Sequence, residues 1–235
     1  MSVISVEKGK VLDLANRMIR RTDVVLDVGP GICPQSFFRP KIHVCVEPFL
    51  PYIERARASV GYDPRYLFLN CTWDIALGVL PDKSVDSVFA IDVIEHFEKN
   101  DGTRFLEEAG RVTRQQIVVF TPMGFFPQSY ADPKKPDRWG MNGGYWQIHR
   151  SGWDPGDFDE SWDLVCCESF HEVDQDEQPL EWPIGAMWAF RNLDPKFGRL
   201  GSGTTKWAPT ALRSRFRLAI TRLGRRVQAC RSEGT

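Results

Sequence analysis

The sequence has no long apolar run. No segment approaches the ~20 consecutive apolar residues that a membrane-spanning helix needs, so no such helix is expected. The N-terminus also lacks the basic start and apolar core of a secretory signal. We therefore expect a cytoplasmic protein.

Recognisable cysteine patterns are missing as well. The chain has 6 cysteines, but no pair has C-x-x-C spacing, and the cysteines and histidines follow no known zinc pattern. Several cysteines fall in apolar, strand-like runs, where cysteine acts as a small hydrophobic residue. We expect reduced, buried thiols, with neither a disulfide framework nor a metal site.

Acidic residues are scarce in the C-terminal segment. Residues 196–235 contain ten lysines and arginines but one acid, Glu233, which gives a net charge of +9. The total charge is −1, so residues 1–195 carry −10. This asymmetry predicts a domain over 1–195 and a basic tail over 196–235.

The tail has an amphipathic pattern over residues 209–229. Such a helix would dock on the acidic domain, contact a second copy of the chain, or lie peripherally on an anionic membrane. No nucleic-acid-binding module accompanies it, so no specific nucleic-acid partner is expected. The oligomeric state stays open.

The first 195 residues alternate between strand-like and helix-like segments. This order predicts a doubly wound, mostly parallel α/β sheet. The expected strands are Val24–Val28, Ile42–Val46, Tyr66–Leu69, Val85–Ile91, Gln116–Phe120, Trp162–Phe170 and Ile184–Asn192. The expected helices are Val6–Arg21, Tyr52–Val60 and about Gly102–Arg114, and Ser151 is expected to cap a further helix containing Pro155 and Phe158.

A short apolar strand leads into a glycine loop. Asp27 and Val28 precede Gly29-Pro30-Gly31, where glycine permits a tight turn and a close ligand approach. A dinucleotide-binding loop would have a third glycine, but Pro34 stands there, and Asp27 would repel a pyrophosphate. The loop therefore favours a ligand with an ammonium or sulfonium group.

An acidic residue follows the next strand. Glu47 lies 20 positions beyond Asp27, where a carboxylate can accept both hydroxyls of a ribose. This device serves NAD enzymes and methyltransferases alike, so Glu47 indicates a nucleoside without choosing the cofactor.

These segments resemble the class I S-adenosylmethionine-dependent methyltransferases, in particular bacterial enzymes acting on small molecules or glycans. The first motif is Asp27–Gly31, and the most specific match is LPDKSVDSVFAIDVIEHFEK, which contains Asp92, Val93 and His96. Thr121-Pro122-Met123-Gly124 is similar to the T-P-x-G loop after the fifth strand of that family. The resemblance implies a Rossmann-like, seven-stranded sheet whose last strand is antiparallel, with S-adenosyl-L-methionine as the cofactor.

The resemblance also implies a set of cofactor-binding residues. The glycine loop would frame the methionyl part, Glu47 the ribose, and the segment after the third strand the adenine, although Trp73 would equally suit the core. The expected set is Asp27, Gly29, Pro30, Gly31, Glu47, Cys71, Thr72, Trp73, Asp92 and Val93.

An aromatic-rich insertion over about 122–150 breaks the strand–helix rhythm. It follows the carboxyl end of a strand, so we interpret it as a lid that excludes water and shapes the acceptor pocket, or as a structural cover on the sheet. Near its end, His149 is the first candidate for a base that accepts a hydroxyl proton, and His96 the second. A structural role fits both histidines as well.

The sequence thus predicts methyl transfer to a small-molecule or glycan-linked acceptor, with oxygen favoured and nitrogen open. Two alternatives remain: an NAD-dependent oxidoreductase, which Asp27 and Pro34 disfavour, and a non-catalytic protein on the same fold anchored through its basic tail.

Overall fold

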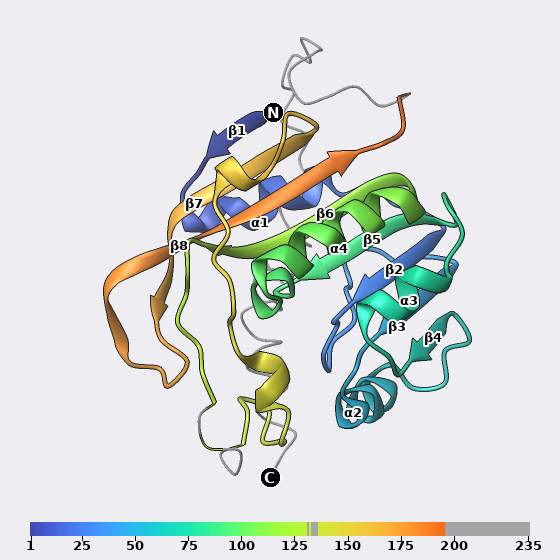
Figure 1. Ribbon diagram of the computed structural model, residues 1–235, viewed down its shortest axis with the longest axis horizontal. Coiled ribbons are helices and arrows are strands. Elements are labelled where there is room, and N and C mark those ends of the chain that lie inside the picture. Colours follow the sequence, from blue (N-terminus) through green and yellow to red (C-terminus); the bar gives the residue numbers. More distant parts are fainter. Residues whose placement is uncertain (131, 133–135, 196–235) are drawn as a thin grey trace, which may run out of the picture.

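The chain folds around one eight-stranded sheet (Figure 1). The computed structural model describes residues 1–130, 132 and 136–195. The strand order is β1-β7-β8-β6-β5-β2-β3-β4. The bounds are β1 Ser2–Ser5, β2 Val24–Val28, β3 Ile42–Val46, β4 Tyr66–Leu69, β5 Val85–Ile91, β6 Thr113–Met123, β7 Trp162–Val173 and β8 Pro179–Asn192.

All neighbouring strands pair in parallel except at β8, which is antiparallel to both β6 and β7. The predicted doubly wound sheet with an antiparallel last strand is confirmed. The sheet has eight strands rather than seven, because β1 pairs with β7 at the edge. The strand β1 was not predicted, because its four residues show no strand-like pattern and no turn signal. A tertiary contact helps to hold it, since the Ser2 hydroxyl donates to Asp163 Oδ1 at 2.6 Å.

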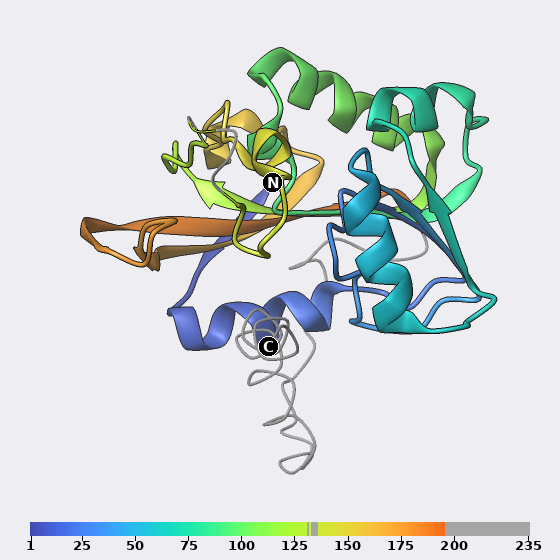
Figure 2. The ribbon, with the colours of Figure 1, turned by 90° about the horizontal axis from the view of Figure 1, so that it is seen from below.

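Helices cover both faces of the sheet (Figure 2). The α-helices are α1 Lys8–Met18, α2 Leu50–Val60, α3 Trp73–Val79 and α4 Lys99–Val112, and the 3-10 turns are η1 Ile94–His96, η2 Gly144–Gln147 and η3 Pro155–Asp157. Phe105 and Ala109 of α4 pack with Val88 and Ile117 on one face. Val11 of α1 packs with the core on the other face.

The connection from β2 to β3 contains no helix. Residues 29–41 form an irregular loop, and its Phe37 and Phe38 rings lie 6.2 Å and 6.1 Å from the Phe89 ring on β5. The loop thereby covers a part of the sheet where a helix would usually pack. The glycines at its start therefore lie in irregular backbone and not at the beginning of a helix.

Two sequence-based expectations are wrong near the C-terminal end of the domain. The last two strands do not stop at Phe170 and start at Ile184 as expected, because β7 and β8 run on past these positions as a long hairpin beyond the body of the sheet (Figure 1). Ser151 caps no helix: its hydroxyl donates to Ile94 O at 3.3 Å, and Asp154 forms the capping box of the short turn η3.

None of the described helices is both long and apolar enough to cross a membrane. The basic segment 196–235, including the amphipathic pattern at 209–229, lies outside the described residues.

Candidate active site

The site begins where β2 and β3 end side by side. Gly29 and Gly31 have left-handed φ angles of 61° and 55°, which favour glycine. A Cβ on Gly29 would lie 2.8 Å from Cγ2 of Val93, so only glycine lets the loop pack so close to the end of β5. The fold therefore brings together two predicted cofactor-binding residues that lie 64 positions apart.

Glu47 closes the other side of the loop. Its side chain is buried, Oε2 accepts from Gly31 N at 3.1 Å, and Oε1 accepts from Phe49 N at 3.0 Å. Burial raises the pKa of Glu47 to about 7, and the two backbone N–H groups oppose that shift. A carboxylate oxygen has two lone pairs, so each oxygen can still accept a further donor.

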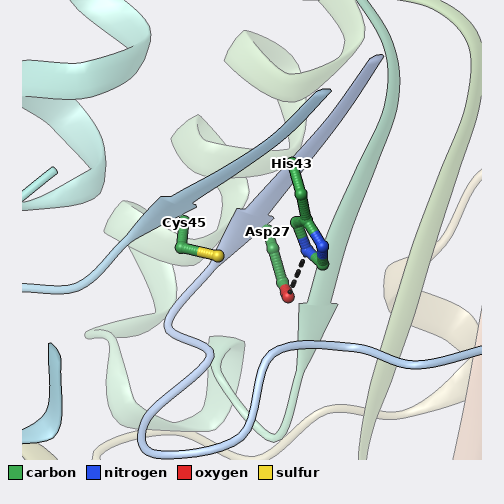
Figure 3. Close-up of side chains that lie close together, drawn as sticks. All are labelled: Asp27, His43 and Cys45. Carbon is green, nitrogen blue, oxygen red and sulfur yellow. Dashed lines mark hydrogen bonds and ion pairs between the residues drawn. The ribbon is translucent and has the colours of Figure 1, made fainter. Parts of the chain in front are cut away.

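Asp27 is more enclosed than expected. Its Oδ2 accepts from Gln35 N at 2.7 Å and lies 3.0 Å from His43 Nε2 (Figure 3). Asp27, His43 and Cys45 are all buried and lie on β2 and β3. Asp27 therefore positions the glycine loop through Gln35, in addition to any charge it offers a cofactor.

The segment predicted to bind adenine, Cys71 to Trp73, spans a turn and the start of a helix. Cys71 and Thr72 lie in the turn after β4, and Trp73 begins α3. The Trp73 ring lies 5.7 Å from the Phe97 ring and 5.6 Å from the Phe105 ring, as the core interpretation of this residue requires. Its contact with a cofactor stays a prediction, as do those of Cys71 and Thr72.

A polar cluster, with Glu95 and His149 buried and Asp92 and His96 half-buried, lies just beyond β5. Asp92 has a left-handed φ of 55°, and Glu95 is 2% exposed. The His96 and His149 ring centroids are 4.8 Å apart, so the fold joins the two candidate bases from η1 and from the end of the lid. Burial raises the pKa of both carboxyls, and the Asp92 charge raises that of Glu95 further.

Both imidazoles are neutral near pH 7. Burial lowers the pKa of His96 to about 3 and that of His149 to about 4. His149 Nδ1 lies 2.6 Å from Phe126 O, and His96 Nδ1 lies 3.1 Å from Ile148 O. A carbonyl oxygen only accepts, so both Nδ1 atoms carry the proton and both Nε2 atoms offer a lone pair.

The lid lies over the glycine loop. A Cβ on Gly31 would lie 3.5 Å from the Trp139 ring. Tyr52 of α2 donates to Asp137 Oδ2 at 2.5 Å, and Arg55 Nη1 donates to Trp139 O at 2.9 Å. Sequence reasoning missed the Tyr52–Asp137 contact, since nothing in the local pattern links two residues 85 positions apart.

A cavity of about 410 Å³ opens between the lid and the β7–β8 hairpin. Its wall combines apolar side chains with amides and carboxylates and includes one candidate base. The lining residues include Phe125, Gln128, His149, Asp174, Gln175 and Leu180. The hairpin residues were also missed, because the two last strands were expected to end at Phe170 and to begin at Ile184.

Comparisons with known proteins agree with this geometry. Residues 26–120 match the family model described as a methyltransferase domain. A search of curated protein sequences gives no significant match. A Bacillus halodurans protein described as a methyltransferase is 13% identical, covers 79% of this chain and 97% of its own, and has a TM-score of 0.51.

Two further solved structures are similar. The Haloferax volcanii protein described as a methyltransferase, in complex with the Trm112 methyltransferase activator, is 14% identical over 82% of this chain and 92% of its own, with a TM-score of 0.50. An S-adenosylmethionine-dependent methyltransferase from Mesorhizobium loti is 15% identical over 76% and 96%, with a TM-score of 0.49.

Residues 26–120 thus carry a methyltransferase domain, and the sheet around them has the fold of solved methyltransferase structures. The match to a methyltransferase domain supports S-adenosyl-L-methionine over NAD as the cofactor, and methyl transfer over a non-catalytic role. The glycine loop fits that cofactor: it has a buried acid at each side, and the lid that covers it would limit access of water. The individual cofactor contacts of the methyltransferase stay predictions.

Proposed function

We propose that the methyltransferase transfers the methyl group to a hydroxyl oxygen of a small-molecule or glycan-linked acceptor bound in the cavity between lid and hairpin. The observation that carries this proposal is the position of His149. Its neutral ring lies in the cavity wall and also against His96, just beyond the end of β5, where Val93 meets Gly29 of the glycine loop. An acceptor in the cavity would thus have a proton-accepting imidazole beside it.

The cavity wall supports this acceptor class. Phe125 is 54% exposed and offers an apolar face, while Gln128, Gln175 and Asp174 offer hydrogen-bonding groups. A pocket with apolar faces and a few polar groups suits a ligand with both C–H faces and hydroxyls. Sugars have both features.

The chemistry needs little from the protein beyond position and dryness. The sulfonium already activates the methyl group, so the acceptor oxygen attacks the methyl carbon, the carbon–sulfur bond breaks, and its electrons stay on sulfur. The hydroxyl proton goes to Nε2 of His149, whose Nδ1–H is held by Phe126 O at 2.6 Å. The products are the methyl ether and S-adenosylhomocysteine.

The tail does not enter this argument. The division into a domain of 1–195 and a basic tail of 196–235, peripheral membrane contact through 209–229 and a cytoplasmic location stay predictions, which rest on the sequence alone.

A labelled-methyl assay tests the proposal. Purified full-length protein would receive S-adenosylmethionine with a labelled methyl group and a panel of sugars, small hydroxyl compounds and amines. We expect transfer to a hydroxyl acceptor, and His149→Gln should lower kcat by about 10²-fold or more while leaving cofactor affinity unchanged. His171→Gln, which removes a nearby half-buried imidazole stacked on Phe126, is the matched control.

Two outcomes would contradict the proposal. Transfer confined to amines would exclude the hydroxyl acceptor, and an unchanged kcat in His149→Gln would exclude His149 as the base. The pH profile adds a check: because burial lowers the pKa of His149 to about 4, kcat/KM for the acceptor, measured with saturating S-adenosylmethionine, should show no rise near pH 6.5.

A further inference from the structure

Three side chains just beyond β5 form a compact set of nitrogen and oxygen donors. Glu95 and His96 come from η1, and His149 comes from the end of the lid. One candidate ligand atom of each residue lies within 4.8 Å of those of the other two. Their spacing in the sequence follows no metal-binding pattern, because the third member arrives from 53 positions away.

The two imidazoles are oriented as metal ligands are. Each donates its Nδ1–H to a backbone carbonyl, His96 to Ile148 O and His149 to Phe126 O. Metal-binding histidines commonly hold their second ring nitrogen in this way, which fixes the tautomer and the ring plane. The lone pairs of both Nε2 atoms are therefore available for one ion.

Glu95 supplies an oxygen that lacks a partner. Its side chain is buried, and Oε2 accepts from the Thr121 hydroxyl at 3.0 Å. Oε1 is also buried and has no hydrogen-bond partner within the described part of the chain. A buried carboxylate oxygen without a donor is costly, so it needs a proton or a cation.

We propose that Glu95, His96 and His149 bind one divalent first-row transition metal ion. Two imidazoles and one carboxylate suit zinc, iron, cobalt or nickel, whereas magnesium and calcium prefer oxygen ligands alone. Ligands bound at about 2.0–2.2 Å stand roughly 3–4 Å from one another, so a small closure of the three side chains completes the site.

The surrounding charge favours a dication. The charge of the Asp92 carboxyl, at the end of β5, raises the pKa of Glu95. The positive charge of the Arg138 guanidinium in the lid lowers the pKa of both carboxyls and of both imidazoles. Because burial raises the pKa of both carboxyls, a bound ion would displace their protons, and the three groups would then carry a net charge of −1 that offsets part of the charge of a dication.

The metal site has a consequence for the reaction that rests on the proposed function. Because His149 also lines the cavity, the ion would lie beside an acceptor bound there, whose hydroxyl oxygen would take its fourth position. The ion would lower the pKa of that hydroxyl, so in the metal-loaded protein His149 is a ligand and the proton leaves to water. Metal binding itself requires neither cofactor nor acceptor.

A second cluster provides an internal comparison. Asp27, His43 and Cys45 also lie within 4.8 Å of one another. There, however, His43 Nε2 already faces Asp27 Oδ2 at 3.0 Å, and burial raises the pKa of the Cys45 thiol, which opposes the thiolate that a metal needs. We therefore assign the metal to the first cluster.

Cobalt titration of the full-length, chelator-treated protein tests the assignment. Without cofactor, we expect one equivalent of Co²⁺ to bind, with weak d–d absorption bands and no thiolate charge-transfer band. Glu95→Gln, His96→Gln and His149→Gln should each weaken binding by tenfold or more, and His43→Gln should bind as the wild type does. Thermal unfolding would confirm that each variant is folded, and three independent ligand variants keep the test open if one is not.

Several results would overturn the proposal. One is the absence of Co²⁺ binding by the wild type, and another is unchanged binding in the folded ligand variants. A thiolate band that disappears in His43→Gln would place the ion at the second cluster instead. A failure of the proposed function looks different, because it would appear as absent or amine-directed methyl transfer while Co²⁺ still binds.

Discussion

Glu47 combines burial with hydrogen bonds that favour its ionised form. The N–H groups of Gly31 and Phe49 point at its two oxygens, yet burial dominates and raises the pKa of Glu47 to about 7. In the cofactor-free methyltransferase this side chain therefore changes charge near neutral pH. Because only the ionised form accepts hydrogen bonds from both ribose hydroxyls, cofactor affinity should follow its titration.

This gives a pH prediction for a single residue. The ionised share of a group with a pKa of about 7 rises about tenfold between pH 6 and pH 8. The dissociation constant of S-adenosylhomocysteine, measured by calorimetry, should fall by a similar factor over that range. In Glu47→Gln the dissociation constant should be larger and nearly independent of pH. A pH dependence equal to that of the wild type would contradict the role of Glu47.

At the scale of elements, the lid is tied to α2 by side chains. Asp137 is buried and accepts from Tyr52 Oη, from Gly143 N at 3.0 Å and from Trp139 N at 2.9 Å. These bonds fix the segment whose Trp139 ring lies over Gly31. The lid thus has a defined point of attachment beside the glycine loop, and release of the cofactor should require that attachment to loosen.

Removal of a single oxygen atom should weaken the attachment of the lid to α2. Tyr52→Phe removes the phenolic donor to Asp137, a hydrogen bond to a charged group worth about 1.5–3 kcal/mol. We expect faster dissociation of S-adenosylhomocysteine by stopped-flow tryptophan fluorescence, by roughly tenfold for the low end of that range. Tyr62→Phe, at a fully exposed tyrosine, is the control, and equal dissociation rates in both variants would rule out this attachment as a gate.

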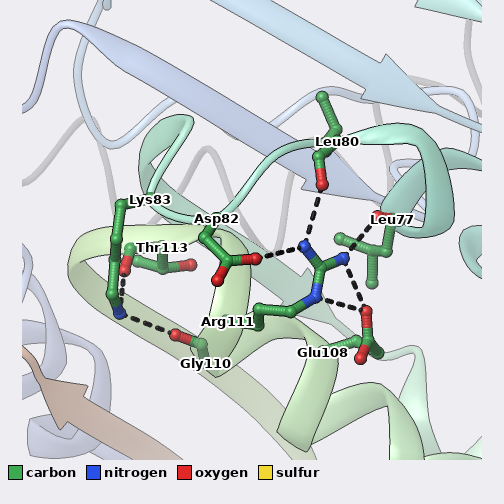
Figure 4. A network of polar contacts seen from close by, with 8 residues as sticks. All are labelled: Leu77, Leu80, Asp82, Lys83, Glu108, Gly110, Arg111 and Thr113. Atoms are coloured by element: carbon green, nitrogen blue, oxygen red, sulfur yellow. Dashed lines mark hydrogen bonds and ion pairs between the residues drawn. The ribbon is translucent and has the colours of Figure 1, made fainter.

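The opposite end of the sheet is held by a different network (Figure 4). The Arg111 guanidinium donates to Leu77 O and Leu80 O and pairs with Asp82 and Glu108. It thereby ties the ends of α3 and α4 to the turn before β5. This network therefore stabilises the end of the sheet that lies away from the site.

For the whole molecule, the sequence predicted what local patterns determine. The β-branched runs predicted the central strands, and the glycine loop and Glu47 were expected at one edge because parallel strands end together. Features that depend on long-range contacts carried no local signal. The strand β1 depends on its pairing with β7, the long hairpin depends on the pairing of β7 with β8, and the attachment of the lid depends on the hydrogen bond from Tyr52 to Asp137. The buried position of Glu95 carried no local signal either, because its side chain accepts from the Thr121 hydroxyl, 26 positions away.

The central claim is that this chain binds S-adenosylmethionine through the glycine loop and Glu47, and the most direct test is ligand-dependent thermal unfolding. Wild type and Glu47→Ala would be compared with S-adenosylmethionine, S-adenosylhomocysteine and NAD. At about 100 times its dissociation constant a ligand adds about 2.7 kcal/mol of stability. We predict that both S-adenosyl compounds raise the unfolding temperature of the wild type, that NAD does not, and that Glu47→Ala loses most of the effect. An unchanged unfolding temperature with both S-adenosyl compounds, or an equal shift in the variant, would contradict the account.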